Sequence, residues 1–219
     1  MDFLSGRYLL SDLVLISMKK LLIATSNPGK KIEILKALET IIKEFELLTL
    51  DNFPNISEPE ETGKTFEENA LIKAKYYALA TNLPTIADDG GIMIDALNGE
   101  PGVRSRRWPG YTATDEELIQ MTLEKMKNIK DSDRQAQLAT CACLYIPSSN
   151  KYFFSSEKIL GKIAHKPIQN YKRGYPFRAL FIVSKLNLFY DQLTDALHDK
   201  MNHRIKAVKK LIKEIEKYI

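Results

Sequence analysis

Two adjacent carboxylates, Asp88 and Asp89, stand between a short apolar run at 84–87 and two glycines. The run reads "PTIA" and is expected to form a short strand, which would place both carboxylates at its carboxyl end. Ligand sites of α/β sheets lie at this end of the strands. Paired carboxylates there commonly hold a divalent cation, because hard cations prefer oxygen ligands. An ordinary Asp-Gly turn would explain the same letters, so the pair alone does not identify a metal site.

A second polar group is the stretch "TSNPGK" at 25–30, which follows the apolar run "LLIA" and precedes the helical pattern "KIEILKAL". A helix N-terminus offers free backbone N–H groups to anions, and here an amide and the Lys30 ammonium stand beside it. The stretch lacks the G-x-x-x-x-G-K-[ST] spacing of a Walker A loop. It is therefore either a phosphate cradle of another kind or only a connector.

Three further groups of charged residues lie elsewhere in the chain. A loop carries Glu60 and Glu61, although acidic loops are most often simply solvated. The loop at 99–110 concentrates three arginines and the tryptophan of the sequence, which suits an anionic ligand with a flat ring. A His-Arg pair at 203–204 precedes a lysine-rich terminal segment. Together, these groups supply what a nucleoside triphosphate needs, namely a cradle, several cations and carboxylates for magnesium.

Hydrophobic periodicity and capping patterns define the elements that must position these groups. Capping boxes at Thr65 and Thr114 open two helices, and apolar residues at spacings of three and four mark another helix after residue 30. Strands and helices alternate early and a long hairpin follows, which predicts an α/β fold with a mixed sheet. The expected helices are 30–45, 65–80, 114–128 and a basic amphipathic helix from residue 202, and the expected strands are 21–24, 45–50, 84–87, 134–146, 151–160 and 178–183.

The composition is that of an ordinary globular chain of 219 residues, of which 44% are hydrophobic and 27% are charged. The net charge of +4 argues neither for nor against a nucleic-acid partner. No run of about 18 apolar residues predicts a membrane span. The two cysteines, Cys141 and Cys143, read as small buried hydrophobes of a reducing compartment, because no further Cys or nearby His completes a metal set.

Residues 1–17 stand apart from this pattern. Three charged residues interrupt their apolar positions, so they do not resemble a signal peptide. Met18 directly precedes the expected first strand. We therefore expect residues 1–17 to be an N-terminal extension from a misassigned start, or else a segment that packs on the domain, with one domain over residues 18–219.

Four blocks in order make the combination specific: "IATSNPGKKIEI", "EETGKTFEENALIKAKYYA", "IADDGGIMIDALNGEPGVRSRR" and "NHRIKAV". They resemble the inosine triphosphate pyrophosphatase family, the non-canonical purine NTP pyrophosphatases, from about residue 20 to residue 214. The resemblance implies an elongated α/β fold, in which a twisted mixed sheet with flanking helices forms two lobes around a nucleotide cleft. It also implies a cytoplasmic homodimer that hydrolyses ITP, dITP and XTP to the monophosphate and pyrophosphate with Mg²⁺, cleansing the nucleotide pool.

The resemblance also implies roles for individual residues. Asp89 matches the general base, Asp88 its acidic neighbour at the metal, and Glu60 a magnesium-binding glutamate. Lys30 is expected to take part in catalysis by neutralising the triphosphate. The full set of expected substrate-binding residues is Thr25, Ser26, Asn27, Pro28, Gly29, Lys30, Lys73, Gly90, Arg107, Phe177, Arg178, His198, His203 and Arg204.

Three departures from the family pattern fall at positions expected to contact the nucleotide and not at the expected metal ligands. Gly90 stands where the family usually has serine. Without gaps, the family block "GGFGYDPIF" aligns with "RGYPFRALF", so that Phe177 replaces tyrosine and Arg178 replaces aspartate. His198 stands where a lysine is expected, although Lys200 is two residues away. Aspartate accepts hydrogen bonds whereas arginine only donates, so the departures put the base preference in question.

The departures leave two interpretations of Arg178. A donor at this position can favour the carbonyl O6 of a keto purine and repel the amino group of adenine. We therefore expect discrimination between ITP and ATP to persist, unless Arg178 is a structural cation.

Two alternatives to the main hypothesis remain open. One is an NTP pyrophosphatase with shifted base specificity. The other is an inactive nucleotide- or RNA-binding protein, which the lysines of the terminal helix suggest. The retained "ADD" motif argues against lost catalysis, and two glutamates interrupt the basic face. We therefore expect a nucleoside triphosphate substrate and Mg²⁺, with no nucleic-acid or membrane partner.

Overall fold

The computed structural model describes residues 18–219, so both expectations about residues 1–17 lie outside the described residues. Within residues 18–219, a seven-stranded sheet has the strand order β2-β1-β3-β4-β5-β6-β7. β1 pairs in parallel with β2 and β3, and the remaining neighbours are antiparallel. The strands are β1 (Lys19–Ile23), β2 (Phe45–Thr49), β3 (Thr85–Ile94), β4 (Gln135–Ile146), β5 (Lys151–Ile163), β6 (Phe181–Val183) and β7 (Leu188–Phe189).

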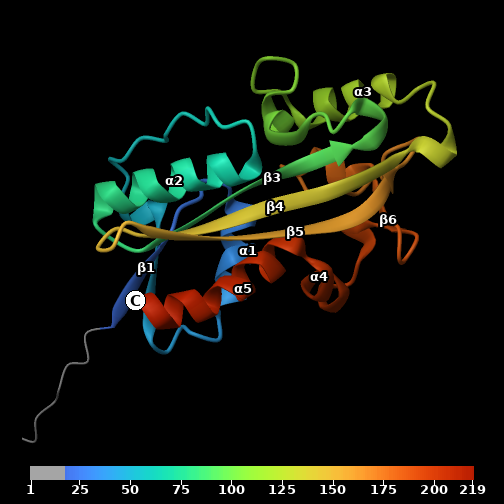
Figure 1. Ribbon diagram of the computed structural model, residues 1–219. Helices are drawn as coiled ribbons and strands as arrows, with labels where there is room; N and C mark the ends of the chain where they lie inside the picture. The colour runs from blue at the N-terminus through green and yellow to red at the C-terminus, as the bar shows by residue number, and fades with distance from the viewer. Residues whose placement is uncertain (1–17) are drawn as a thin grey trace, which may run out of the picture.

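Helices cover both faces of this sheet, as Figure 1 shows. The α-helices are α1 (Pro28–Leu38), α2 (Phe66–Thr81), α3 (Asp115–Lys125), α4 (Asp195–Met201) and α5 (His203–Tyr218). The short 3₁₀ segments are η1 (Leu50–Asn52), η2 (Asp95–Leu97), η3 (Gly102–Arg107), η4 (Asp131–Asp133), η5 (Pro176–Ala179) and η6 (Tyr190–Gln192). The expected mixed α/β architecture is therefore confirmed.

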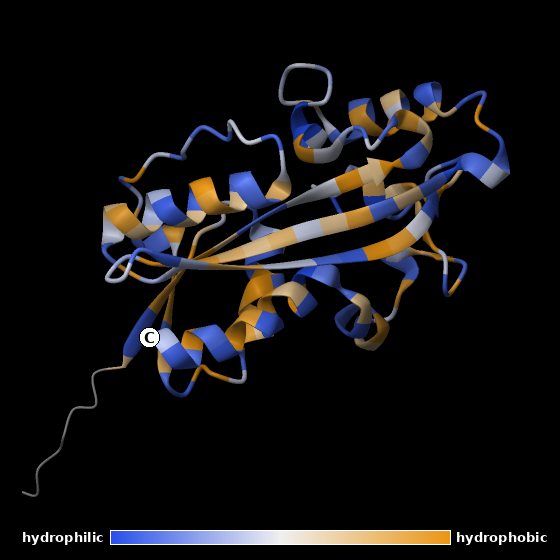
Figure 2. Ribbon diagram, in the orientation of Figure 1, coloured by the Kyte–Doolittle hydropathy of each residue, from blue (hydrophilic) through white to orange (hydrophobic). Residues whose placement is uncertain are grey.

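Three hydrophobic clusters hold these layers together. One lies between the sheet and the helices α1 and α5, and a second lies between the sheet and α2. The third gathers α3, η5 and the far ends of β3, β4 and β5. Figure 2 shows hydrophobic residues along the central strands and on the helices that pack against them. The sheet therefore carries one core on each face at one end and a separate core at the other end, which gives the fold two lobes.

The expected helix 114–128 ends at Lys125 and the expected strand 151–160 continues to Ile163, and three further boundaries differ in ways that matter for the site. The first helix ends at Leu38 rather than at residue 45. The expected strand 178–183 begins as the 3₁₀ segment η5 and becomes a strand at Phe181. The expected short strand 84–87 continues to Ile94, because residues 85–94 all pair with β4. The two aspartates consequently lie inside a strand and not after its end.

The extension of β3 creates the space for a site. β1 pairs with β3 only as far as the pair Ile23 and Ile86. The chain then leaves the sheet at Ala24 and turns into α1. From Asp88 onward, the edge of β3 that faced β1 therefore has no paired strand beside it among the described residues, until Met93 forms an isolated bridge with Pro101.

Candidate active site

A cavity of about 620 Å³ lies beside this part of β3. Its lining comes from segments far apart in the sequence: the loop before α1, the middle of β3, the segment before α2, the η3 region, the loop before η5 and the start of α5. The lining residues of these segments include Thr25, Ser26, Asn27, Pro28, Lys30, Glu61, Lys73, Asp89, Gly90, Arg106, Arg107, Gly174, Tyr175, Phe177, Arg178, His203 and Arg204. Most of the expected substrate-binding residues therefore meet at one pocket.

The loop before α1 differs from the expected cradle of free backbone N–H groups. Asn27 caps the helix, and its Oδ1 accepts hydrogen bonds from the N–H groups of Gly29 at 2.9 Å and Lys30 at 3.1 Å. The N–H of Lys31 donates to the Asn27 carbonyl at 3.0 Å, and Pro28 has no N–H. An anion at this helix start must therefore be bound mainly by side chains, of which the largely buried Lys30 ammonium carries the charge.

Gly29 serves packing and does not line the pocket. A Cβ at this position would lie 2.2 Å from the hydroxyl oxygen of Tyr175 and 2.5 Å from its ring. No Cβ approaches another heavy atom so closely, so the side chain of Tyr175 can occupy this place only because residue 29 is a glycine.

Asp88 and Asp89 project from opposite faces of the sheet, because side chains alternate along a strand. Asp88 lies on the face of α1 and α5, whereas Asp89 lies on the face of α2. Figure 1 shows these helices on opposite sides of the sheet. Asp88 is absent from the lining of the pocket and Asp89 lines it. The expectation that both carboxylates face one metal ion does not match this geometry.

Asp88 is the centre of a buried ion network. Its Oδ2 accepts a hydrogen bond from Nε of Arg204 at 2.7 Å and lies 3.3 Å from the Lys30 ammonium. Burial by itself would raise the pKa of Asp88, but Arg204 and Lys30 outweigh burial and hold this pKa far below its usual range. Burial lowers the pKa of Lys30. Asp88 is therefore a permanent anion that holds two cations of the pocket in place.

Asp89 has a different environment on the other face. Its Oδ2 accepts a hydrogen bond from the Asn69 side-chain amide at 3.1 Å, and its Oδ1 lies 3.6 Å from the Lys73 ammonium. Burial raises the pKa of Asp89, although Lys73 and Lys30 oppose the shift. A carboxylate with a raised pKa that faces a pocket has the properties of a general base.

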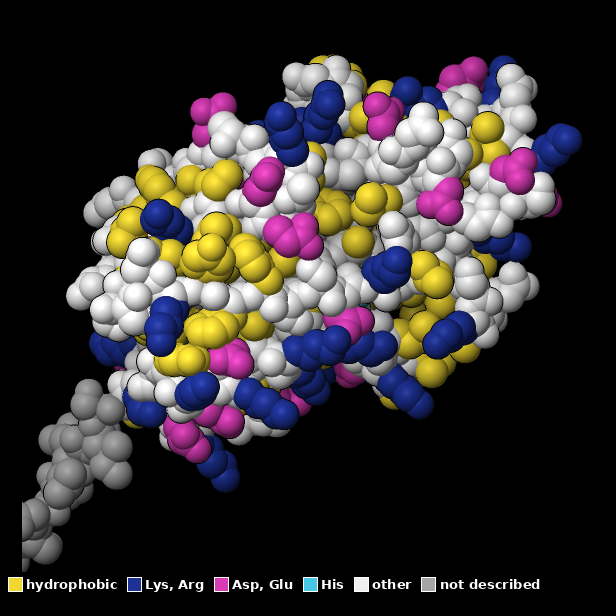
Figure 3. Space-filling model, in the orientation of Figure 1, with side chains coloured by type: hydrophobic (Ala, Val, Ile, Leu, Met, Phe, Trp, Pro, Cys, Tyr) yellow, Lys and Arg dark blue, Asp and Glu magenta, His cyan; other side chains and the backbone are white. Residues whose placement is uncertain are grey.

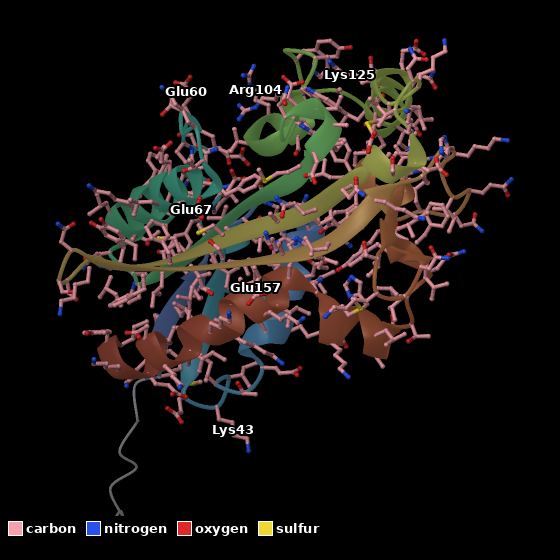
Figure 4. The ribbon with its side chains drawn as sticks, turned by 45° about the vertical axis from the view of Figure 1, so that its right-hand side comes forward. Lys43, Glu60, Glu67, Arg104, Lys125 and Glu157 are labelled. Carbon is pink, nitrogen blue, oxygen red and sulfur yellow. The ribbon has the colours of Figure 1, made fainter. Side chains whose placement is uncertain are left out.

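Glu61 and Glu58 line the pocket, whereas the expected metal ligand Glu60 does not. Glu61 Oε1 lies 2.6 Å from the Lys73 ammonium, and Glu61 Oε2 lies 3.1 Å from Nη2 of Arg107. Glu60 is exposed, and Figure 4 shows it at the outer tip of its segment, pointing away from the sheet. Glu60 and Glu61 are neighbours in an extended segment, so only one of them can point into the pocket.

A second buried carboxylate, Glu33 of α1, lies behind the other end of the pocket, where it pairs with the lining residues Arg178 and Arg204. Its two oxygens accept hydrogen bonds from Arg178 at 2.8 Å and from Arg204. Burial would raise the pKa of Glu33, but the two guanidinium groups lower it to about 2. The Arg178 guanidinium also lies 3.7 Å from the centre of the Tyr175 ring. Arg178 is therefore both a pocket residue and a buried structural cation.

The remaining residues with expected ligand contacts divide between the pocket and its support. Phe177 and His203 line the pocket, and both are buried. His198 lies outside the lining, packs against Tyr190 and stands 3.9 Å from Glu33. Burial and the neighbouring Arg178 lower the pKa of His198, so this side chain supplies no permanent charge where the family pattern has a lysine.

Gly90 lines the pocket, and its position explains why the family's serine is absent. A Cβ there would lie 2.5 Å from the carbonyl oxygen of Ala139 on β4. The two strands therefore approach too closely for a side chain in this chain.

Sequence reasoning overlooked four residues at the site: Glu33, Asn69, Glu61 as the inward glutamate, and Tyr175. Glu33 and Asn69 lie inside helical patterns, where a polar residue is ordinarily expected to face solvent. Tyr175 belongs to the aligned block "RGYPFRALF", so the alignment contained a signal for it. No local signal separates Glu61 from Glu60, because the two letters are identical.

Replacing Gly29 with Ala tests the packing against Tyr175. The new methyl group would displace the tyrosine, so we expect a lower melting temperature and a raised KM for the substrate. In the background of Tyr175→Ala, which removes the obstructing ring, Gly29→Ala should cost much less stability. Thermal unfolding of the four proteins of this double-mutant cycle measures the coupling. An equal cost in both backgrounds would contradict the assignment.

Comparison with known proteins identifies the family of this chain. A family model described as the Ham1 family matches residues 21–214. The dITP/XTP pyrophosphatase of Elusimicrobium minutum is 38% identical over 199 residues, which cover 90% of this chain and all of that protein. The dITP/XTP pyrophosphatase of Bacillus subtilis is 37% identical over 202 residues, covering 92% of this chain and all of that protein.

Solved structures give the same result for the fold. The HAM1 protein from Coxiella burnetii superposes with a TM-score of 0.80 at 32% identity, covering 91% of this chain and all of that one. The Ham1 protein of Staphylococcus aureus has a TM-score of 0.78 at 32% identity, covering 92% of this chain and all of that one. The family resemblance noted in the sequence is confirmed, and the chain belongs to the Ham1 family.

Proposed function

We propose that this protein hydrolyses the non-canonical purine nucleoside triphosphates ITP, dITP and XTP to the monophosphate and pyrophosphate with Mg²⁺. The observation that carries the proposal is the group formed by Asp89, Lys73 and Glu61 at the wall of the pocket. A carboxylate with a raised pKa, a second carboxylate and several cations there match the needs of phosphoryl chemistry. The curated relatives described above carry the name dITP/XTP pyrophosphatase.

The donor set fits a magnesium ion. Glu61 and Asp89 both approach the Lys73 ammonium, at 2.6 and 3.6 Å, so their oxygens already converge on a cation. Among residues 18–219, no three Asp, Glu, His or Cys side chains gather closely enough to hold a metal by themselves. Mg²⁺ ordinarily uses one or two carboxylates together with substrate phosphates and waters. Bound there, it would supply charge stabilisation to the phosphates, with Glu61 and Asp89 as its protein ligands.

The chain's own residues divide the remaining work. Asp89 orients a water molecule toward the α-phosphorus and accepts its proton, while the bond between the α-phosphorus and the bridging oxygen breaks and pyrophosphate leaves. Lys30, Lys73 and Arg107 neutralise the triphosphate. Asn69 donates to Asp89 and fixes the orientation of its carboxylate. Asp88 acts through the cations that it holds rather than through the metal.

The base end of the pocket bears on a second candidate, the same enzyme with shifted base specificity. Arg178 lines this end as a donor where the family pattern has an acceptor. His203 also lines the pocket, and its buried Nδ1 atom finds no hydrogen-bond partner among the described residues. Keto purines offer the carbonyl O6 to these groups, which supports retained keto preference through a changed contact.

The remaining proposals concern the localisation, the oligomeric state and the partners of the enzyme. We place it in the cytoplasm as a homodimer, because the two cysteines are buried and free and the family resemblance implies a dimer. No helix in the described part of the chain combines the length and apolar character needed to cross a membrane. In Figure 3, basic side chains over α5 are interspersed with acidic ones, and Lys210 pairs with Glu157, so a nucleic-acid partner is not favoured.

A pyrophosphate-release assay with ITP, XTP, dITP, GTP, ATP and dUTP, with and without Mg²⁺, tests the proposed function. We expect ITP, dITP and XTP, the non-canonical keto purine triphosphates of this panel, to be cleaved fastest. We expect cleavage only when Mg²⁺ is present. Asp89→Asn should lower kcat by about 10²–10⁴, because asparagine keeps the shape but cannot accept the proton. The variant should unfold at nearly the parent temperature. Activity within a few-fold of the parent would refute the role of Asp89.

Glu61 and Glu60 form a matched pair for testing the metal ligand. Glu61→Gln should raise the Mg²⁺ concentration needed for half-maximal activity by roughly tenfold or more, because a carboxylate ligand is lost. Glu60→Gln makes the same chemical change one residue away on an exposed side chain and should leave the Mg²⁺ titration unchanged. The reverse result would restore Glu60 as the ligand.

Replacing Arg178 tests base discrimination. Arg178→Ala should narrow the ratio of kcat/KM for ITP over ATP by roughly tenfold or more, because a site that pairs a polar substrate group rejects the mismatched analogue. It should also lower stability, because Glu33 loses one of its two arginines. Arg178→Lys keeps a charge for Glu33 and separates the two effects. If both variants keep the parent ratio and only the melting temperature falls, Arg178 is structural.

A further inference from the structure

Asp115 connects two loops that both line the pocket. One oxygen of its carboxylate, Oδ1, accepts a hydrogen bond from Nη1 of Arg106 at 2.5 Å. The other oxygen, Oδ2, accepts a hydrogen bond from the backbone N–H of Gly174 at 2.7 Å. Asp115 is only 6% exposed and is itself absent from the pocket lining, whereas Arg106 and Gly174 belong to it.

The first of these loops is the arginine loop, defined as η3 (Gly102–Arg107). Its last residue, Arg107, reaches Glu61 at 3.1 Å, at the end of the pocket where the metal and the triphosphate are proposed to bind. A hydrogen bond links this loop to the segment before α3: the N–H of Ala113 donates to the carbonyl of Arg106 at 3.1 Å. Arg106 itself is half-exposed along its side chain, so the bond to Asp115 is its anchor.

The second is the aromatic loop, defined as residues 174–178. It begins at Gly174, whose φ of 84° lies in the left-handed region that glycine adopts without strain. Tyr175 and Arg178 follow in the chain. They line the end of the pocket where the base is proposed to bind, beside Glu33 and His203. The N–H of Gly174 therefore fixes the point at which this loop enters the site.

We propose that Asp115 is a positioning residue that sets the separation between the triphosphate end and the base end of the site. The inference rests on the proposed function, because it assumes that a nucleoside triphosphate spans both loops. A single buried carboxylate with one oxygen on each loop makes the position of one loop depend on the other. The chain places this carboxylate at the first residue of α3, whose N-terminus is capped by Thr114 and is therefore itself fixed.

A neighbouring link provides a matched control. Oε1 of Glu116 accepts a hydrogen bond from Nη1 of Arg173 at 2.5 Å, so it also joins α3 to the segment that enters the aromatic loop. These two side chains are 62% and 78% exposed, and ion pairs in water contribute little. Glu116→Gln therefore changes the same helix and the same segment without loosening the buried link.

The experiment compares a ligand that spans both loops with one that engages the arginine loop alone. We would measure kcat and KM for the triphosphate that the parent cleaves best, and the inhibition constant of inorganic tripolyphosphate. Asp115→Ala should raise KM by roughly 10- to 100-fold, because small misplacements of substrate are costly, while the tripolyphosphate constant changes less than about threefold. Asp115→Asn keeps an acceptor for Gly174 and should give an intermediate KM. Glu116→Gln should match the parent.

Two results would overturn the proposal. Equal weakening of substrate and tripolyphosphate would mean that Asp115 supports the arginine loop only. A lower melting temperature with unchanged KM would mean that it supports the fold only. If Asp115→Ala does not fold, Asp115→Asn carries the same comparison. If the parent cleaves none of the tested triphosphates, the proposed function fails, and calorimetric affinities for a triphosphate and for tripolyphosphate still reveal the difference between the two ligands.

Discussion

A buried network of charges underlies the arrangement of the whole site. Asp88 of β3 and Glu33 of α1 share Arg204 of α5, and Lys30 and Arg178 complete the group. Each residue comes from a different part of the chain or a different turn of a helix, so the network joins the sheet to the helices on one of its faces. Removing one partner of such a buried pair costs about 3–5 kcal/mol, because the other charge is left uncompensated.

The consequences of this network reach the opposite face of the sheet. Asp88 takes up its cations on the α1 and α5 side, and strand alternation then directs Asp89 toward α2 and the pocket. The two carboxylates have opposite pKa shifts, because Arg204 and Lys30 outweigh burial at Asp88, whereas burial outweighs Lys73 and Lys30 at Asp89. One adjacent pair of identical residues thus yields a permanent structural anion and a carboxylate suited to accept a proton.

The ligand side of the site shows how the chain accommodates its departures from the family pattern. Arg178 would be costly in a buried position, but Glu33 neutralises it and the Tyr175 ring packs against its face. Gly29 in turn leaves space for Tyr175. Arg178, Tyr175 and Gly29 therefore depend on one another, and a change at any of them is expected to disturb the others.

Many of the secondary-structure elements depend on neighbouring residues and could be predicted from the sequence. The capping boxes at Thr65 and Thr114 and the long hairpin of β4 and β5 appear in the structure as expected, because caps and alternation act over a few residues. The family was predictable from four ordered motifs. The resemblance to the family then pointed to most of the residues that line the pocket. A helix start was predicted at about residue 30, and the structure begins the helix at Pro28, with its first amides occupied by the Asn27 cap.

The tertiary structure alone decided which of two identical neighbouring residues faces the pocket. The sequence contains two adjacent glutamates and two adjacent aspartates, and only the direction of each side chain distinguishes Glu61 from Glu60 and Asp89 from Asp88. That direction depends on β3 continuing past the end of β1, which is set by pairing with β4 some fifty residues later. The partnership of Glu33 with Arg178 joins positions 145 residues apart, and Asp115 joins loops on either side of it. Such contacts are fixed by long-range packing, for which no pattern of neighbouring residues provides a signal.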